Sequence, residues 1–285
     1  MTRTSNRLIR TALAIGALAF SAAGTAAERV STLTPSKSGG MDVDYTIAFW
    51  TLPFGHTSFA LRFNNSAYRI ESHFETSGII SALWDSHIDA SASGQIGARG
   101  IAPATYDSMY RRGNTHHQRV RVTFPAGAVP VTYADPPYNT KKYPVSDEEK
   151  KQGYDPLSAA TSFLAGLRAT AGNPCGTAAP VFDGRRRYNI EFTYVRDEQV
   201  KLESGLYSGK AHLCQLHYNQ IAGFKPKILK EGRALPPAYA WVAEIPSASA
   251  PLGYYLLPLK AWTSTGFGTV TATLTAMNLD GAAKG

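Results

Sequence analysis

Alternation of apolar and polar residues with a period of two is the feature that most constrains the fold of this chain. Aromatic or aliphatic residues alternate with polar, charged or small ones in residues 43–49, 59–63, 68–74, 119–124, 188–194 and 270–275. Successive side chains of a β-strand point to opposite faces of a sheet, so the pattern describes strands with one buried and one wetted face. Such strands are typical of antiparallel sheets, because doubly wound parallel sheets bury both faces.

Local signals place a helix and two turns among these strands. Residues 155–168 are the best helix, with Asp155 as a cap, Pro156 at the first helical position and an apolar stripe formed by Leu157, Ala160, Leu164 and Leu167. The Asp183-Gly184 pair predicts a tight hairpin, since glycine supplies the positive φ that such turns require. A turn is also expected at residues 53–55. The helix is expected to pack on the sheet.

Residues 1–27 have the layout of a cleaved secretory signal peptide. A basic region with Arg3, Arg7 and Arg10 precedes an apolar run of about ten residues, and small residues lead to a cut after Ala27. The run is far shorter than the roughly twenty residues of a membrane-spanning helix. We therefore expect an exported, periplasmic protein, with a flexible leader at 28–41, one domain at 42–278 and a polar C-terminal tail at 279–285.

The net charge of +8 falls when the predicted signal peptide is removed. The whole chain has 29 basic and 21 acidic residues, and cleavage after Ala27 removes three of the basic ones and leaves a net charge of +5. Basic clusters remain at residues 111–112, 119–121, 185–187 and 225–233, where they can face anionic lipid, glycan phosphate or an acidic partner. An exported protein rarely meets nucleic acid, so no nucleic-acid partner is expected.

The chain contains two cysteines, Cys175 and Cys214. An oxidising compartment favours a disulfide between them over two free thiols. Catalytic use of either thiol would need a positioned histidine or a second cysteine in a C-x-x-C motif. His212 lies near Cys214 in a strand-like segment without such a motif, so we predict a structural bridge.

The motifs of known catalytic and cofactor sites are absent from the sequence. It contains neither the G-x-S-x-G turn of hydrolases nor S-x-x-K, H-E-x-x-H, C-x-x-C or a phosphate-binding glycine loop. Surface positions are expected for all the histidines, namely His56, His73, His87, His116, His117, His212 and His217. No catalytic residue, metal ligand or cofactor is predicted. Carboxylates that folding brings together remain an alternative, with the candidates Asp85, Asp89, Asp107 and Asp183.

Two architectures remain open for the aromatic strands. The aromatic side chains either form a packed core or line an apolar pocket on the concave side of a curled sheet. A membrane-spanning barrel also has alternating strands behind a signal peptide. The irregular strand spacing, the inserted helix and cysteine pair, and the polar C-terminus argue against it, so an integral membrane protein is not expected.

Several short motifs together resemble the DUF3108 family of exported bacterial proteins. They are Tyr45–Phe49, Gly100–Pro103 with Tyr106, Asp155–Ser158, Phe182–Arg186 and a late strand with Trp241. The resemblance spans residues 43–277. It implies an all-β domain with a minor helix, in which a strongly curled antiparallel sheet or open β-barrel packs on that helix in the periplasm. It carries no catalytic residues.

These observations lead to one functional expectation and two alternatives. We expect a non-catalytic periplasmic protein, associated with the cell envelope and supporting its integrity, that binds an amphipathic, lipid-like or glycolipid ligand or an envelope protein. The ligand-binding residues and the oligomeric state are not specified by the sequence. The first alternative is a carboxylate-dependent hydrolase of envelope glycans, and the second is a structural scaffold without a ligand.

Overall fold

The structure, a computed structural model, describes residues 39–64, 66–97, 100–113, 116–230 and 235–284. The predicted signal peptide and nearly all of the predicted leader lie outside these residues. Within the described ranges, no helix is long and apolar enough to cross a membrane.

Strands make up most of the described chain. In chain order they are β1 (Gly40–Phe49), β2 (Leu52–Asn64), β3 (Ala67–Thr76), β4 (Ser86–Gly97), β5 (Gly100–Arg112), β6 (His116–Thr123), β7 (Val131–Asp135), β8 (Ala179–Phe182), β9 (Arg187–Lys201), β10 (Ser208–Ala222), β11 (Ala238–Pro246), β12 (Tyr254–Thr265), β13 (Gly268–Leu279) and β14 (Ala282–Lys284). The helices are α2 (Gly78–Leu83), α3 (Asp147–Gln152), α4 (Pro156–Leu164) and α5 (Pro226–Lys230).

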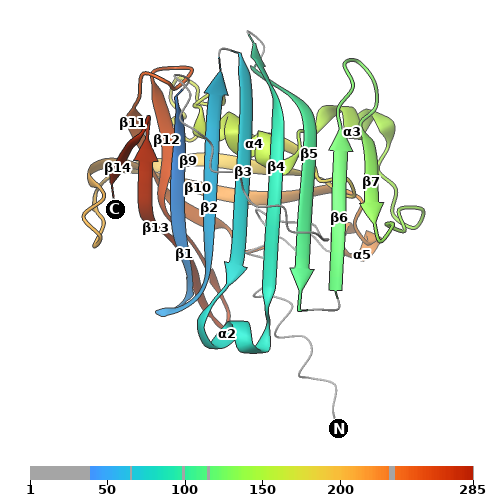
Figure 1. The fold of residues 1–285 in the computed structure, drawn as a ribbon, viewed down its shortest axis with the longest axis horizontal. Helices are drawn as coiled ribbons and strands as arrows, with labels where there is room; N and C mark the ends of the chain where they lie inside the picture. Colours follow the sequence, from blue (N-terminus) through green and yellow to red (C-terminus); the bar gives the residue numbers. More distant parts are fainter. Residues whose placement is uncertain (1–38, 65, 98–99, 114–115, 231–234, 285) are drawn as a thin grey trace.

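The strands form one antiparallel sheet that curls but does not close. Its order is β7-β6-β5-β4-β3-β2-β1-β13-β12-β11-β10-β9-β8, and β14 pairs with β13 off this path. In the described residues, the edge strands β7 and β8 are not hydrogen-bonded to each other. Figure 1 shows β2 to β6 in one layer, with β9 and β10 crossing behind them. The expected all-β class, with a curled sheet or open barrel and a minor helix, is confirmed.

The two edges of the sheet meet through side-chain packing at the hairpin between β8 and β9. Gly184 forms the predicted turn there with a φ of +88°. A Cβ atom at this position would lie 2.8 Å from Val120 Cγ1 on β6 and 3.1 Å from Thr132 Cγ2 on β7. Glycine is therefore required twice at this turn, by its left-handed backbone and by the closeness of the opposite edge.

Helix α4 fills the concave side of the sheet. It contacts β3, β4 and β5 and also β8 and β12, and Figure 1 shows it behind β3 and β4. The structure confirms the expected start of the helix, with Asp155 as N-cap and Pro156 in its first turn. The expected single stripe is wrong, because Ser158, Ala159, Thr161 and Ser162 are buried as well as the apolar residues. Packing on both sides buries the helix nearly all round.

Two further details differ from the sequence pattern. Residues 53–55 lie within β2, and Trp50 and Thr51 form the turn between β1 and β2. The pairing register of β1 with β2 shifts between Ile47 and Ala48, a bulge that accommodates Pro53 within the strand. The predicted polar C-terminal tail, 279–285, contains the short strand β14.

The two cysteines join the segment that follows α4 to strand β10. Cys175 and Cys214 are bonded through their sulfur atoms, and their Cα atoms are 5.7 Å apart. Both residues are completely buried. The bridge therefore holds the connection between α4 and β8 against the sheet.

Replacing both cysteines by serine should lower the free energy of unfolding by about 4 kcal/mol, because the bridge closes a long loop in the unfolded chain. Urea unfolding of the oxidised protein and the double variant measures the difference. Thiol labelling of the exported protein without reductant should modify neither cysteine. Stoichiometric labelling under those conditions would contradict the bridge.

Candidate functional site

Two histidines and a glutamate come together on the convex face of the sheet, where β3 ends and β4 begins. His73 and Glu75 lie two residues apart on β3, so their side chains point to the same face. His87 on β4 lies directly opposite Glu75 in the pairing register. Directly opposed side chains of an antiparallel pair have their Cβ atoms about 5 Å apart. The register thus places all three side chains within reach of one another.

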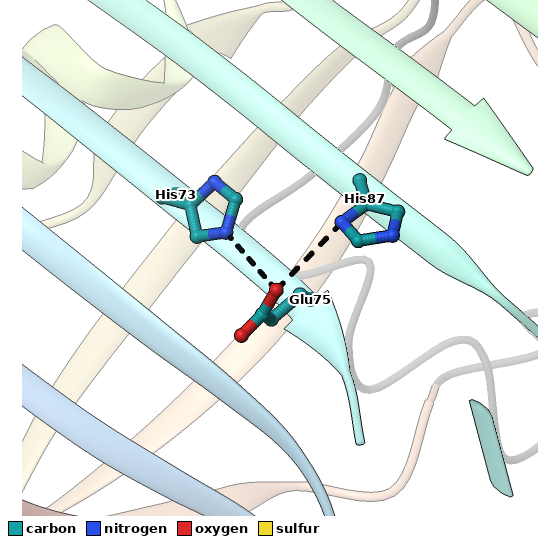
Figure 2. Close-up of side chains that lie close together, drawn as sticks. All are labelled: His73, Glu75 and His87. Carbon is teal, nitrogen blue, oxygen red and sulfur yellow. Dashed lines mark ion pairs between the residues drawn. The ribbon is translucent and has the colours of Figure 1, made fainter. Parts of the chain in front are cut away.

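One nitrogen of each imidazole points toward the same glutamate oxygen, as Figure 2 shows. The distance from Glu75 Oε2 is 3.6 Å to His73 Nε2 and 3.8 Å to His87 Nδ1. The three ligand atoms all lie within 4.8 Å of one another. The side chains are partly exposed, so the cluster is open to solvent ions.

The second nitrogen of each imidazole is held by an aspartate. His73 Nδ1 lies 2.7 Å from Asp89 Oδ1, and His87 Nε2 lies 2.9 Å from Asp85 Oδ1. The hydrogen bond to Asp89 raises the pKa of His73, and the same bond lowers the pKa of Asp89. Arg111 Nη2 also lies 3.1 Å from Asp89 Oδ2. These contacts set the ring orientations in the cluster.

The sequence analysis did not predict this cluster. In the sequence its only trace is the pattern H-x-E at residues 73–75 and H-x-D at residues 87–89. Surface positions were expected for His73 and His87, and both are partly exposed, but they are neighbours rather than isolated. The cluster can be recognised only when the pairing register of β3 with β4 is known, because that register places His87 opposite Glu75. Shifting that register by one residue would move His87 to the other face.

The four candidate carboxylates do not converge on one place. Asp85 and Asp89 belong to the histidine cluster. Asp107 accepts hydrogen bonds from Arg119 and Arg121 at 2.7–2.9 Å. Asp183 is buried, and its Oδ1 accepts from the backbone N–H groups that follow in the β8–β9 turn.

Another histidine, His212, lies between two carboxylates on β9 and β11. Its Nδ1 is 2.6 Å from Asp197 Oδ1 and its Nε2 is 3.3 Å from Glu244 Oε1. Because these carboxylates bind opposite sides of the ring, they do not share a ligand position. His212 is buried, so the expected surface position is wrong for this histidine, which is held between the carboxylates of two neighbouring strands.

An apolar rim lies at the end of the sheet where β1, β3 and β12 finish. Trp50, Leu52 and Phe267 are exposed by 65%, 51% and 58% in the turns between β1 and β2 and between β12 and β13. The two turns touch, because Trp50 N–H donates to Thr269 O at 2.7 Å. The Trp50 ring also stacks on the ring of Phe49. We call Trp50, Leu52 and Phe267 the apolar rim.

Asp155 has a raised pKa, as many catalytic carboxyl groups do, but its contacts serve to hold helix α4 in place. Complete burial raises its pKa from 3.8 to about 6. Its Oδ1 accepts from the Ser158 N–H at 2.8 Å, and its Oδ2 accepts from the Ser158 hydroxyl. The Tyr68 hydroxyl on β3 lies 2.6 Å from that of Ser158. The chain of contacts from Tyr68 through Ser158 to Asp155 ties the start of α4 to the sheet.

The DUF3108 sequence profile, described as a protein family of unknown function, matches residues 42–275. The chain belongs to the DUF3108 family. No curated protein matches it. Among solved structures, it is similar to a β-barrel-like protein of the DUF1849 domain of unknown function from Brucella abortus. The TM-score is 0.48 at 10% identity, with 85% of this chain and 98% of that chain covered.

Two of the motifs that resemble those of DUF3108 have structural positions in this chain. Asp155–Ser158 caps α4 and holds it to β3, and Phe182–Arg186 forms the hairpin at which the sheet edges meet. Both motifs are buried in large part. The histidine cluster and the apolar rim lie outside these motifs.

Replacing Asp155 by asparagine should remove a pH-dependent loss of stability. A buried carboxyl with a raised pKa binds its proton more tightly in the folded state, so stability falls as pH rises from about 4 to 6. A rise from 3.8 to about 6 corresponds to roughly 3 kcal/mol. Relative to Asp155→Asn, the unmodified protein should lose this amount between pH 4 and pH 7, as measured by urea unfolding at each pH.

Asp147 provides a matched control for this measurement. It lies in the first turn of α3 and is exposed, and its pKa is lowered by the hydrogen bond from Lys150. Asp147→Asn should not reproduce the effect of Asp155→Asn. Parallel pH profiles for the unmodified protein and Asp155→Asn would contradict the buried ionisation.

Proposed function

We propose that this protein is an exported, non-catalytic component of the periplasm that supports the cell envelope by binding a lipid bilayer surface through its apolar rim. The signal peptide predicted from the sequence of residues 1–27 supports the compartment. The rim supports the ligand class, because tryptophan and phenylalanine side chains partition into the interface between lipid head groups and acyl chains.

The conformation of Trp50 is the observation that carries the proposal. Its φ is +54°, and its side chain is largely exposed. A left-handed backbone costs a residue with a Cβ atom roughly 1–2 kcal/mol, and glycine or asparagine is the usual occupant of such a turn. Within the protein the indole stacks on Phe49 and packs against Gly268, yet Trp50 remains 65% exposed. Contact with an apolar surface outside the protein would bury the exposed part of the ring.

The position of α4 argues for the rim rather than the interior as the lipid-binding surface. The helix packs against both layers of the sheet, and residues such as Leu157 and Phe163 belong to the main core cluster. The aromatic residues of the concave face therefore serve the core. An amphipathic ligand finds its apolar contact instead at the exposed turns.

The size of the rim predicts weak and reversible binding. Burying one large apolar side chain contributes roughly 1.5–3 kcal/mol, and about half of each of the three rim side chains is available. Their sum is on the order of 4 kcal/mol, which corresponds to a dissociation constant of about 1 mM. Such an affinity suits a protein that samples a surface within a confined compartment.

The hydrolase alternative gains no support from the carboxylates. A glycosidase needs two carboxyl groups facing one substrate. Asp107 is instead held by two arginines and Asp183 is buried in a turn, while Asp85 and Asp89 are each bound to a histidine ring. A protein partner at the rim and a scaffold without a ligand are the remaining alternatives, and the following experiment separates both from a lipid surface.

Trp50→Gly should reduce binding to vesicles of phosphatidylethanolamine and phosphatidylglycerol about tenfold, since a tenfold change corresponds to about 1.4 kcal/mol. Its stability should stay within about 1 kcal/mol of the unmodified protein, because glycine relieves the left-handed backbone. Vesicle flotation measures binding, and urea unfolding measures stability. Phe267→Ser should weaken binding similarly.

Leu252→Ser is the matched control, because Leu252 is 52% exposed in the connection between β11 and β12 at the opposite end of the sheet. Flotation of this variant should equal that of the unmodified protein. The lipid proposal would be overturned if Leu252→Ser lost as much vesicle binding as Trp50→Gly. It would also be overturned if the unmodified protein did not float with the vesicles. A rim-dependent crosslink to an envelope protein without flotation would show a protein partner instead.

A further inference from the structure

We propose that His73, Glu75 and His87 form a binding site for a divalent transition-metal ion, with Zn²⁺ as its expected occupant. Two imidazole nitrogens and one carboxylate oxygen are a ligand set that zinc takes in proteins. The site is independent of the apolar rim. It differs from the sequence-based expectation that no metal ligand is present.

The spacing of the three ligand atoms supports the assignment. Donor atoms about 2.1 Å from a tetrahedral zinc ion lie about 3.4 Å from one another. Glu75 Oε2 is 3.6 Å from His73 Nε2 and 3.8 Å from His87 Nδ1. All three ligand atoms fall within 4.8 Å. Small side-chain rotations bring them onto one ion without movement of the strands.

The orientation of the two imidazole rings supports the metal site independently of these distances. Metal-binding histidines usually donate their other ring N–H to a carboxylate, which fixes the tautomer and strengthens the ligand. Asp89 accepts from His73 Nδ1 and Asp85 lies against His87 Nε2. Each histidine therefore turns its remaining nitrogen toward Glu75. A cluster of simple ion pairs does not require both rings to converge in this way.

The local charge also favours a cation. Three carboxylates surround the two imidazoles, and Arg111 is the basic side chain that pairs with them through Asp89. With neutral histidines, the cluster and Arg111 together have a net charge of −2, which a divalent ion balances. Metal binding displaces protons from the imidazoles.

The backbone holds the ligands on a rigid platform. His73 and Glu75 occupy one face of β3, and His87 lies on β4 in direct register with Glu75. Their neighbours Phe74 and Ile88 are buried on the opposite face in one apolar cluster. Three protein ligands leave a position for water or an outside ligand, as in zinc sites with open coordination.

Zn²⁺ titration of the purified protein, prepared without a polyhistidine tag and stripped with a chelator, tests the proposal by isothermal calorimetry. One ion per chain should bind with micromolar or tighter affinity. His73→Ala, His87→Ala and Glu75→Gln should each abolish this binding. Asp89→Asn should weaken it about 10- to 100-fold, because Asp89 only orients His73.

His117→Ala is the matched control. His117 is exposed on β6 and lies in register with Arg111, two strands from His87. This variant should bind Zn²⁺ as the unmodified protein does. Circular dichroism and thermal unfolding without metal establish that each variant is folded.

Two outcomes would overturn the site. One is the absence of one-to-one binding in the unmodified protein, and the other is binding that folded His73→Ala and His87→Ala variants retain. The absorption spectrum of bound Co²⁺ gives a second readout, since its visible bands report coordination geometry. A spectrum equal to that of the hydrated ion would contradict imidazole ligation.

Discussion

The packing of α4 into the concave face of the sheet is the interaction on which the rest of the structure depends. A curled antiparallel sheet with one apolar face must cover that face, and a short helix buried on both sides does so here. Asp155 begins this helix, and the hydrogen bonds through Ser158 to Tyr68 tie it to β3. Burial of the carboxyl raises its pKa, which shows that anchoring the helix opposes the ionisation of its own cap.

The sheet is held in its curled form at two further places. The hairpin at Gly184 packs one edge against β6 and β7, and the disulfide between Cys175 and Cys214 holds the segment after α4 to β10. Because β7 and β8 lack hydrogen bonds to each other in the described residues, the two edges of the open sheet meet only through the packing at this hairpin. Two of the motifs on which the resemblance to DUF3108 rested, Asp155–Ser158 and Phe182–Arg186, lie in these contacts.

The outward side of the same strands is free to vary in chemistry. Each buried residue on β3 and β4 alternates with an outward one, so Phe74 and Ile88 face the core while His73, Glu75 and His87 face solvent. The proposed metal site therefore uses side chains that the core does not need. It lies toward the same end of the sheet as the apolar rim, and the two surfaces are chemically distinct.

Alternation in the sequence was enough to determine the all-β class and the buried face of the strands in which it was found, and turn and capping residues determined the Asp183-Gly184 hairpin and the start of α4. These features depend on neighbouring residues, and local sequence records them. Tertiary structure alone decided the burial of α4 nearly all round, the turn at Trp50 and the convergence of His73, Glu75 and His87. Each depends on which strand lies beside which and in what register, and the residues of a single segment do not encode that.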